Sequence, residues 1–339
     1  MAAPTAAATA TTLTVCLDWT PNTNHAGFFI ALQEGLYAEK NLDVTLKSPD
    51  ADPQETLTPA RQVASGKANF AITPSESAIS FATTDHDVPQ LVAVAALVQG
   101  SQSAICTLKS SGIDRPSKLA GKRYASYNGR FEDPIVARMV QQDGGDASTV
   151  IFHPLESHAY AESDTMGASS VVASYLEKGR SDSTWIFAAW EGVIASRAGQ
   201  ELHCFALEDY DIPYGYSPIL LAHPDVLSGE HADATRAFLA ATAEGYRRAA
   251  SDPKAAAAAL CASGHPSLID RALVEQSAAL LADKFLTSSG AWGTMELGRW
   301  DAFVNFLSAS GILINRANEP IARESVDTAA LFTNAYLPG

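Results

Sequence analysis

The stretch that decides the fold is Leu17-Asp18-Trp19-Thr20-Pro21-Asn22-Thr23-Asn24-His25, where a strand-like run meets a helical one. Residues 13–19 are strand-like, and residues 26–37 carry apolar side chains in a largely helical pattern. Polar side chains and free helix N–H groups therefore meet at one sheet edge, where open α/β folds bind small molecules. The candidate ligand contacts here are Trp19, Asn22, Asn24 and His25. Alternatively, the indole covers the core and the asparagines only turn the chain.

Composition limits the class of protein. A chain of 339 residues suits two domains, and 47% hydrophobic content can fill two cores. The formal net charge of −15 argues against nucleic acid or an anionic membrane as a partner, because both attract clustered lysine and arginine. No apolar stretch reaches the roughly 18 residues of a membrane span, so none is expected.

The N-terminal residues and the cysteines bear on location. Residues 1–11 lack the basic and apolar parts of an export signal and predict a disordered leader. The four cysteines are far apart in the sequence, and the first three lie in apolar strand-like runs, so we expect buried free thiols. No CxxC pair or Cys/His cluster occurs, so no metal site is expected. Free thiols favour a reducing compartment, so we expect a cytoplasmic location for the chain as given. If a leader was removed, the location would be periplasmic or lipid-anchored. The cysteines are Cys16, Cys106, Cys204 and Cys261.

Two series of alternating strand-like and helical runs follow one another, over residues 13–98 and 122–197. This rhythm predicts an α/β fold with mostly parallel sheets and flanking helices. After a further strand at residues 217–222 the chain turns helical. The amphipathic helices are expected at residues 231–250, 267–285 and 295–308.

An inserted second unit would make the molecule two-lobed. The chain would then cross between lobes near residues 103–107 and 206–213, and two crossings make a hinge. Lobe 1 would comprise residues 12–104 and 213–339, and lobe 2 residues 105–212. Loops from both lobes would touch a ligand enclosed between them.

Thr73-Pro74-Ser75-Glu76 follows a strand directly and predicts a helix start. Thr73 would be the N-cap, Pro74 the first helical residue, and Glu76 the partner in a capping box. In that arrangement Glu76 folds back on the backbone. Ser75 and Ser77 remain free to face the cleft.

The matching corner of the second unit spans residues 127–134, with Asp133 as the expected N-cap. Gly129 permits close backbone approach, and Asn128 and Arg130 are candidate ligand contacts. Arg130 would receive an anionic group or lie solvated on its loop. The corner is neither a GxGxxG motif nor a P-loop, so no nucleotide cofactor is inferred.

Trp190-Glu191-Gly192 follows a strand-like run and predicts an aromatic face beside a carboxylate. A flat heteroaromatic ring suits that pair, because the indole stacks on the ring and the carboxylate accepts from a ring amine or protonated ring nitrogen. The alternative is a surface glutamate that begins a helix. Tyr214 and Tyr216 would form one wall of the cleft, whereas Trp292 and Trp300 are expected in the core.

These motifs together resemble a known family over roughly residues 12–338. It contains formylaminopyrimidine-binding proteins, sulfonate- and nitrate-type (SsuA-like) solute-binding proteins and the fungal thiamine-pyrimidine synthase. The opening motif, the Pro-Ser-Glu-Ser at residues 74–77, the Trp-Glu-Gly and the closing residues 331–338 are most similar to the pyrimidine-binding branch. The resemblance implies a two-lobed type II periplasmic-binding-protein fold, with thiamine-related aminopyrimidines as ligands.

The sequence departs from the fungal synthase at the residues that carry its chemistry. In that enzyme a histidine is consumed, a lysine holds pyridoxal phosphate and iron is required. The positions that match the lysine and the histidine are Thr73 and Ser77, and residues 213–218 replace the cysteine-rich iron motif. Because a hydroxyl replaces neither an amine nor an imidazole, the departures favour a binding protein without cofactor or metal over an enzyme.

We therefore expect a cleft that closes on a thiamine-precursor 4-aminopyrimidine and stacks it between Trp19 or Trp190 and a tyrosine, with Glu191 on its amino edge. An ABC transporter permease would be a partner if the protein is exported. Two alternatives stay open. One is a pyrimidine synthase with another donor, for instance His25, and the other is a solute-binding subunit for a molecule such as a sulfonate.

Overall fold

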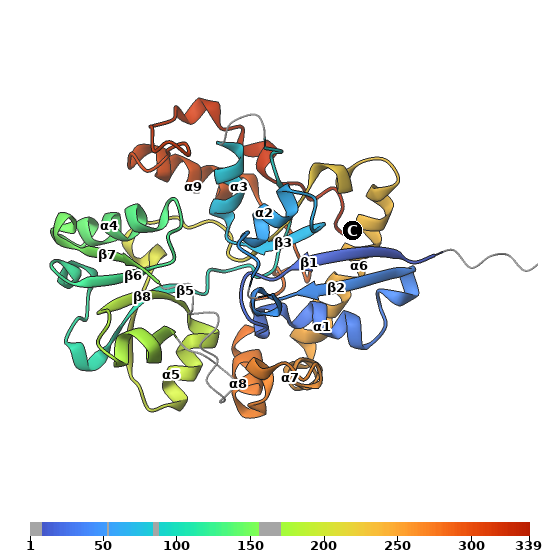
Figure 1. Ribbon diagram of the computed structural model, residues 1–339, viewed down its shortest axis with the longest axis horizontal. Helices are drawn as coiled ribbons and strands as arrows, with labels where there is room; N and C mark the ends of the chain where they lie inside the picture. The colour runs from blue at the N-terminus through green and yellow to red at the C-terminus, as the bar shows by residue number, and fades with distance from the viewer. Residues whose placement is uncertain (1–8, 53, 84–87, 156–170) are drawn as a thin grey trace, which may run out of the picture.

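The computed structural model of the chain describes residues 9–52, 54–83, 88–155 and 171–339. Two five-stranded sheets, each with its own helices, form two lobes that lie side by side (Figure 1). No helix in these ranges combines the length and hydropathy needed to span a bilayer. The predicted two-lobed α/β fold is confirmed.

The first sheet carries the opening motif at the end of its strand β1. Its strands, in spatial order, are β2 (Leu42–Lys47), β1 (Thr11–Cys16), β3 (Phe70–Thr73), β10 (Ile219–Ala222) and β4 (Val92–Ala96). β1 pairs in parallel with β2 and β3, whereas β10 runs antiparallel to β3 and β4. Four strands therefore point one way, which brings the ends of β1 and β3 to one edge.

The second sheet repeats this plan. Its strands, in spatial order, are β7 (Ile151–Pro154), β6 (Arg123–Ser126), β8 (Ser183–Phe187), β5 (Ser103–Leu108) and β9 (Leu202–Ala206). β6 is parallel to β7 and β8, and β5 is antiparallel to β8 and β9. Residues 103–107, where the first crossing was expected, thus already belong to strand β5 of the second sheet. The lobe boundaries stay a prediction.

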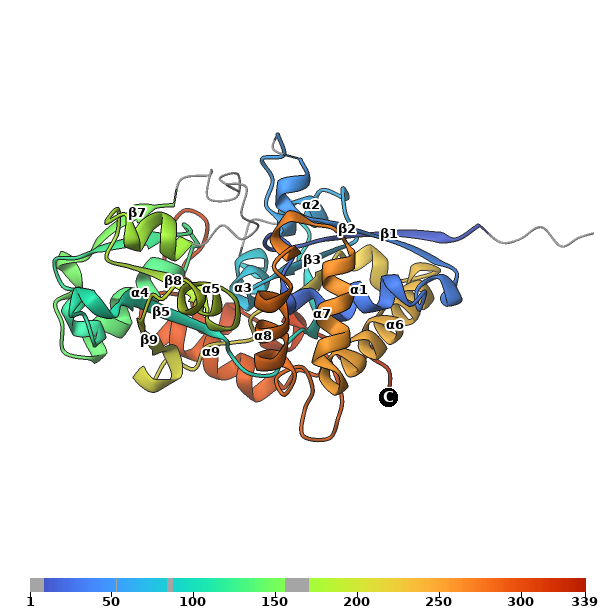
Figure 2. The same cartoon turned by 90° about the horizontal axis from the view of Figure 1, so that it is seen from below.

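Helices cover both sheets (Figures 1 and 2). They are α1 (Ala26–Gln33), α2 (Pro59–Ala64), α3 (Ser75–Ala82), α4 (Glu132–Gln142), α5 (Val193–Arg197), α6 (His231–Ser251), α7 (Pro253–Ala262), α8 (Arg271–Leu281) and α9 (Leu297–Ala309). Because side chains alternate along a strand, Val15 packs with α1 and α6 on one face, and Cys16 joins the cluster of α3 and α9 on the other. Trp292 and Trp300 are buried, as predicted.

Glycines let α1 and α6 approach closely beneath the opening motif. A Cβ on Gly245 would lie 2.0 Å from the carbonyl oxygen of Gly27, and a Cβ on Gly27 would lie 2.1 Å from the Tyr246 ring. The tight contact brings the Tyr246 hydroxyl within 2.6 Å of the Asn24 carbonyl oxygen, to which it donates. The helix pair therefore fixes the corner that follows β1.

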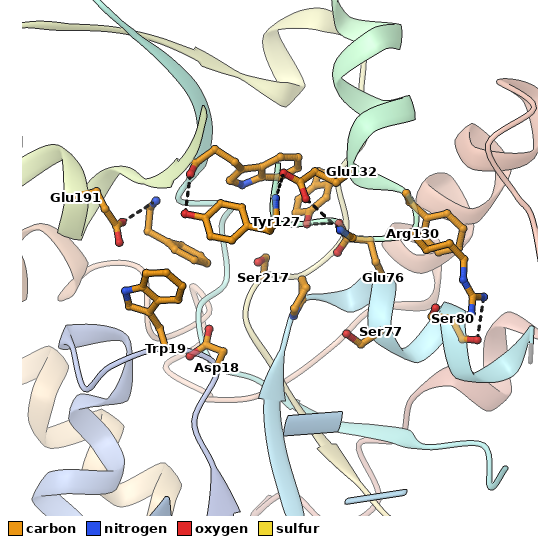
Figure 3. A pocket seen from close by; sticks show the side chains of 16 residues that line it. Asp18, Trp19, Glu76, Ser77, Ser80, Tyr127, Arg130, Glu132, Glu191 and Ser217 are labelled. Atoms are coloured by element: carbon orange, nitrogen blue, oxygen red, sulfur yellow. Dashed lines mark hydrogen bonds between the residues drawn. The ribbon is translucent and has the colours of Figure 1, made fainter. Parts of the chain in front are cut away.

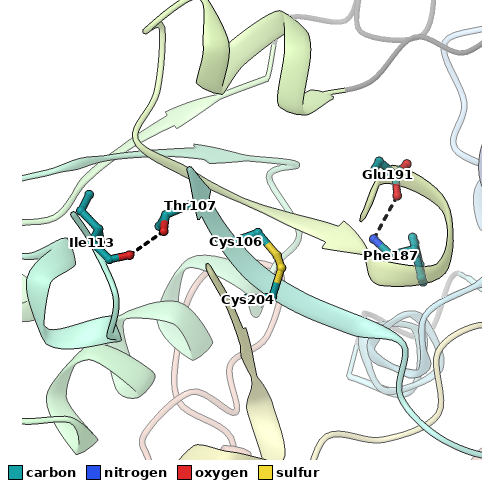
Figure 4. The surroundings of a disulfide bond; sticks show 6 residues. All are labelled: Cys106, Thr107, Ile113, Phe187, Glu191 and Cys204. Atoms are coloured by element: carbon teal, nitrogen blue, oxygen red, sulfur yellow. Dashed lines mark hydrogen bonds between the residues drawn. A yellow bond between two sulfur atoms is a disulfide. The ribbon is translucent and has the colours of Figure 1, made fainter. Parts of the chain in front are cut away.

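The prediction of four free thiols is wrong for two of them. Cys106 in β5 and Cys204 in β9 form a disulfide (Figure 4). The two residues are direct partners in the antiparallel ladder, with their Cα atoms 4.2 Å apart, so their side chains meet on one face. Cys16 and Cys261 are free thiols. The argument for a reducing compartment loses its basis.

The predicted leader falls mostly on residues 1–8, which lie outside the described residues. Thr11, its last residue, already belongs to β1, because it pairs with Leu42 at the start of β2. The C-terminal helices lie close to their expected positions. The Ala-rich helix α7 was not predicted, and it packs against α8.

Candidate functional site

A cavity of about 270 Å³ lies where the two lobes meet. Its lining comes from the ends of strands and the starts of helices in both sheets: Asp18, Trp19, Pro74, Glu76, Ser77, Ser80, Tyr127, Gly129, Arg130, Phe131, Glu132, Trp185, Phe187, Glu191, Tyr214 and Ser217. Figure 3 shows Glu191, Trp19 and Asp18 at one end, with Glu76 and Arg130 toward the other. The size is near the lower limit of about 300 Å³ for small-molecule pockets, so it suits a ligand of one ring.

Aromatic rings from both lobes wall the cavity. Trp19 and Tyr127 meet edge to face, with ring centroids 5.9 Å apart. Trp185 lies 5.3 Å from Tyr214 in a tilted pair, and Phe187 adds a further ring. Rings in such geometry offer both a face and an edge to a flat ligand. Tyr127 was not among the predicted contacts, although it ends a strand-like run as Trp19 does.

The opening motif supplies Asp18 and Trp19 to the cavity, while its other polar residues lie in the interior. Asn22 and His25 form a reciprocal cap of a short 3₁₀ helix, η1 (Thr23–His25), and both are buried, as is Asn24. Within the lining as described, none of these three side chains takes part. The alternative that the asparagines turn the chain therefore describes them better.

His25 acts on the site through Asp18. The backbone N–H of Asn22 donates to Nδ1 of His25 at 3.2 Å, which makes Nδ1 an acceptor. Nε2 therefore carries the proton and donates to Oδ1 of Asp18 at 2.9 Å. With both ring nitrogens engaged and its side chain fully buried, His25 holds the Asp18 carboxylate in place and does not reach the cavity.

Glu191 reaches the cavity, but its neighbour Trp190 does not. Both lie in the π-helical turn η9 (Ala188–Gly192) after β8, where adjacent side chains point in different directions. Trp190 is buried in the hydrophobic cluster of the first lobe, and η9 packs against α8. Oε2 of Glu191 accepts the Phe187 N–H at 3.0 Å (Figure 4). Within the described residues its Oε1 accepts no bond from another residue.

The predicted capping box at Thr73 is wrong. Thr73 ends β3, Pro74 is the N-cap and α3 begins at Ser75, without a side-chain capping bond. The Glu76 carboxyl instead turns toward the cavity, where its Oε1 accepts from the Tyr214 hydroxyl at 2.6 Å. Tertiary contact with a tyrosine of the crossing segment outcompetes the local cap.

Glu132, which was not among the predicted contacts, holds the strand-to-helix corner at residues 127–134. Its Oε1 accepts from the Tyr124 hydroxyl at 2.8 Å and the Tyr127 N–H at 3.1 Å, and its Oε2 accepts from the Gly129 N–H at 3.2 Å. α4 therefore begins at Glu132 with Phe131 as N-cap, and the expected cap at Asp133 is wrong.

Arg130 lines the cavity but uses its guanidinium to join the lobes. Nη1 donates to the Ser80 carbonyl at 3.1 Å and to the Thr83 hydroxyl at 3.0 Å. Asn128 turns the chain with a φ of 60° and is not among the described lining residues. Arg130 is therefore anchored to the first lobe through Nη1, by bonds to two neutral oxygen atoms.

Of the remaining predicted contacts, some line the cavity and others are buried away from it. Ser77 and Tyr214 line the cavity, whereas Ser75 and Tyr216 do not. Ser75 is fully buried against Gly215, where an added Cβ would lie 2.3 Å from its Oγ. The Tyr216 hydroxyl accepts from the Glu296 N–H at 3.0 Å, and its ring packs under Arg299. The structure thus gathers Trp19, Ser77, Arg130, Glu191 and Tyr214 from the predicted set.

Burial makes two of the cavity acids hold their protons unusually tightly. It raises the pKa of Glu76 and of Glu191 from 4.5 to about 7, and the neighbouring carboxylates of Glu132 and Asp18, respectively, add to the shift. The pKa of Glu132 is also raised by burial, against the three bonds that it accepts. Near neutral pH the cavity therefore holds a mixture of protonated and ionised acids.

Because these pKa values are raised, the folded protein should lose stability as the pH rises. Between pH 4.5 and 7 the folded chain binds more protons at Glu191 than the unfolded chain, so ionisation favours unfolding there. The unfolding free energy of Glu191→Gln minus that of wild type should therefore be on the order of 2 kcal/mol larger at pH 8 than at pH 5. Urea unfolding of both proteins at the two pH values measures this. A difference that does not change with pH would contradict the shift.

The lining does not fit the cofactor of the fungal synthase. Among its described residues there is neither a lysine nor a histidine, so no Schiff base with pyridoxal phosphate can form from it. Of the two positions that match the synthase, Thr73 is buried in β3 and Ser77 faces the cavity. Within the described ranges no three metal-binding side chains gather together. The expectations of no cofactor and no metal stay predictions.

Comparison with known proteins places the chain in a family. A formylaminopyrimidine-binding protein of Halalkalibacterium halodurans is 25% identical over 301 residues, covering 88% of this chain and 85% of that protein. A putative thiamine biosynthesis protein of Haemophilus influenzae is 28% identical over 132 residues, 39% of this chain and 40% of that protein. The alkanesulfonate-binding protein SsuA of Xanthomonas axonopodis pv. citri, solved with MOPS, superposes with a TM-score of 0.66.

The SsuA superposition covers 96% of this chain and 99% of the other at 14% sequence identity, so it establishes the fold alone. The family model described as "NMT1/THI5 like" matches residues 22–256. That range includes the end of the opening motif from Asn22 onward, both helix starts and the Glu191 turn, and it leaves out Asp18 and Trp19 of the cavity lining. The chain therefore belongs to the NMT1/THI5-like family.

Proposed function

We propose that this protein binds a thiamine-precursor 4-aminopyrimidine, of the formylaminopyrimidine or hydroxymethylpyrimidine type, in the cavity between its lobes. It would thereby serve thiamine biosynthesis, salvage or uptake. The observation that carries the proposal is the Glu191 carboxyl, buried at the end of the cavity that Trp19 walls. The similarity to a formylaminopyrimidine-binding protein over most of the chain supports it.

Glu191 suits the edge of an aminopyrimidine. Such a ring presents an exocyclic N–H donor next to a ring nitrogen acceptor, and a carboxylic acid has the complementary pair of atoms. With a pKa of about 7, Glu191 makes the same two bonds whether the shared proton lies on the carboxyl or on the ring nitrogen. Oε1 and the Oε2 that already accepts from Phe187 would both take part.

The charges around the cavity disfavour the sulfonate alternative. Four carboxyl groups line the cavity, at Asp18, Glu76, Glu132 and Glu191, against one cation among the described lining residues, Arg130. An anion placed among these acids meets repulsion that a low-dielectric site strengthens. A neutral or cationic flat ring instead stacks on the aromatic wall and donates to the acids.

Calorimetry tests the proposal directly. Wild-type protein titrated with hydroxymethylpyrimidine should bind with a dissociation constant of about 10 μM or tighter, and titration with MOPS should give no heat of binding. A protein that binds the sulfonate and ignores the pyrimidine would belong to the solute-binding alternative.

We also propose that the protein works outside the reducing cytoplasm. The Cys106–Cys204 disulfide supports this, because such bonds persist in oxidising compartments. The periplasm, or a lipid anchor at the cell surface, then replaces the cytoplasmic location expected from free thiols. An ABC transporter permease would be the partner there.

A further inference from the structure

The end of the cavity away from Glu191 carries an acid with an unused oxygen. We call this end the Glu76 end and define it by Glu76, Ser77 and Glu132. Figure 3 shows Glu76 and Glu191 on opposite sides of the cavity, with Ser217 between them. The Glu76 end is therefore distinct from the amino-edge site of the proposed function.

Both oxygens of Glu132 are engaged within the protein. Its two oxygens accept the Tyr124 hydroxyl and the backbone N–H groups of Tyr127 and Gly129. These bonds hold the loop between β6 and α4 against the cavity. Glu132 thus contributes negative charge and shape, while its hydrogen bonds are internal.

Glu76 is different, because only one of its oxygens is occupied. Oε1 accepts from the Tyr214 hydroxyl, whereas Oε2 is buried and has no hydrogen-bond partner among the described residues. A buried acceptor without a donor is costly, so a site of this kind gains when a ligand supplies the donor. Glu76 lines the cavity, which is where that donor would come from.

The charge at the Glu76 end favours a cation over a neutral donor. The Glu132 carboxylate repels that of Glu76, and a positive group between them would relieve that repulsion. Arg130, the cation that lines this part of the cavity, points its Nη1 toward Ser80 and Thr83 instead. An anionic group here would face two carboxylates.

These observations extend the proposed function and rest on it. We propose that Glu76 is the specificity-determining residue for the ring substituent: it favours a substituent that donates an N–H, most strongly a protonated amine, and it disfavours a phosphate ester. The protein then binds an aminomethyl- or other N–H-bearing pyrimidine before it is phosphorylated. Its ligand then donates to Glu191 through the ring amine and to Glu76 through the substituent.

The test compares 4-amino-2-methylpyrimidines that differ only in the substituent at ring position 5. For wild type, the aminomethyl compound should bind at least about 10-fold more tightly than the methyl compound, because a charge-assisted bond is added. The phosphate ester of the hydroxymethyl compound should bind at least about 10-fold more weakly than the methyl compound. Calorimetry at about pH 7.5 gives all three dissociation constants.

The variant Glu76→Gln isolates the residue. It should reduce the advantage of the aminomethyl compound to less than about 3-fold and leave the affinity for the methyl compound nearly unchanged. Glu275→Gln makes the same chemical change on α8, outside the cavity lining, where the half-buried Glu275 pairs with Arg271, and it should behave as wild type. Binding of the methyl compound also shows that each variant is folded.

The outcomes separate this inference from the proposed function. If wild type binds the methyl and aminomethyl compounds equally, or if Glu76→Gln keeps the preference, the role of Glu76 is overturned and pyrimidine binding stands. A variant that loses both compounds equally, with an unchanged melting temperature, also contradicts a role in substituent choice. If folded wild type binds none of the pyrimidines, both proposals fail.

Discussion

Replacing Glu191 by alanine is expected to weaken binding of hydroxymethylpyrimidine by at least about 100-fold, or about 3 kcal/mol. The side chain is 3% exposed and carries the carboxyl at the Trp19 end of the cavity. Its loss leaves the exocyclic amine and a ring nitrogen of the ligand buried without partners, which is why the expected effect is large. Calorimetry on wild type and variant measures it.

Two controls distinguish lost recognition from a disturbed turn. Alanine also removes the acceptor for the Phe187 N–H, whereas Glu191→Gln keeps an acceptor oxygen and removes the acid. Both variants should lose affinity, and the control Glu275→Gln on α8 should not. Equal affinity of wild type and Glu191→Ala for the pyrimidine would remove Glu191 from the site.

Removing the disulfide is expected to cost about 2–4 kcal/mol of unfolding free energy. Cys106 and Cys204 are separated by 98 residues, so the bond closes a long loop in the unfolded chain and ties the edge strand β9 to β5. The double variant Cys106→Ala/Cys204→Ala should unfold at lower urea concentration than wild type.

Reductant supplies the control for this prediction. It should destabilise wild type and leave the double variant unchanged, because Cys16 and Cys261 are free thiols. Alkylation of the denatured, unreduced protein should label those two cysteines. Labelling of all four would show that the bond does not form, and the proposed location outside the cytoplasm would lose its support.

Much of the fold was predictable because its signals are local. The alternation of strands and helices and the helix starts near residues 75 and 132 follow from periodicity and turn chemistry. The runs around Cys106 and Cys204 are strand-like in the sequence, and they form β5 and β9. The Cys106–Cys204 bond depends on their pairing, which spans about a hundred residues and leaves no local trace.

The sequence indicates which strand-to-helix turns form the site, but not which way their side chains point. The sequence indicates that Trp19, Ser77 and Glu191 follow strands, and they do line one cavity. It does not indicate that His25 would turn inward to hold Asp18, or that Trp190 would pack beneath its own turn. Glu76 was assigned to a local cap because its actual partner, Tyr214, is 138 residues away.

A crystal structure of the complex with hydroxymethylpyrimidine tests the central claim most directly. The account predicts the ring in the interlobe cavity, against the rings of Trp19 and Tyr127, with its exocyclic amine within hydrogen-bonding distance of Glu191. A ring bound elsewhere, or one in the cavity with its amine turned away from Glu191, would contradict it.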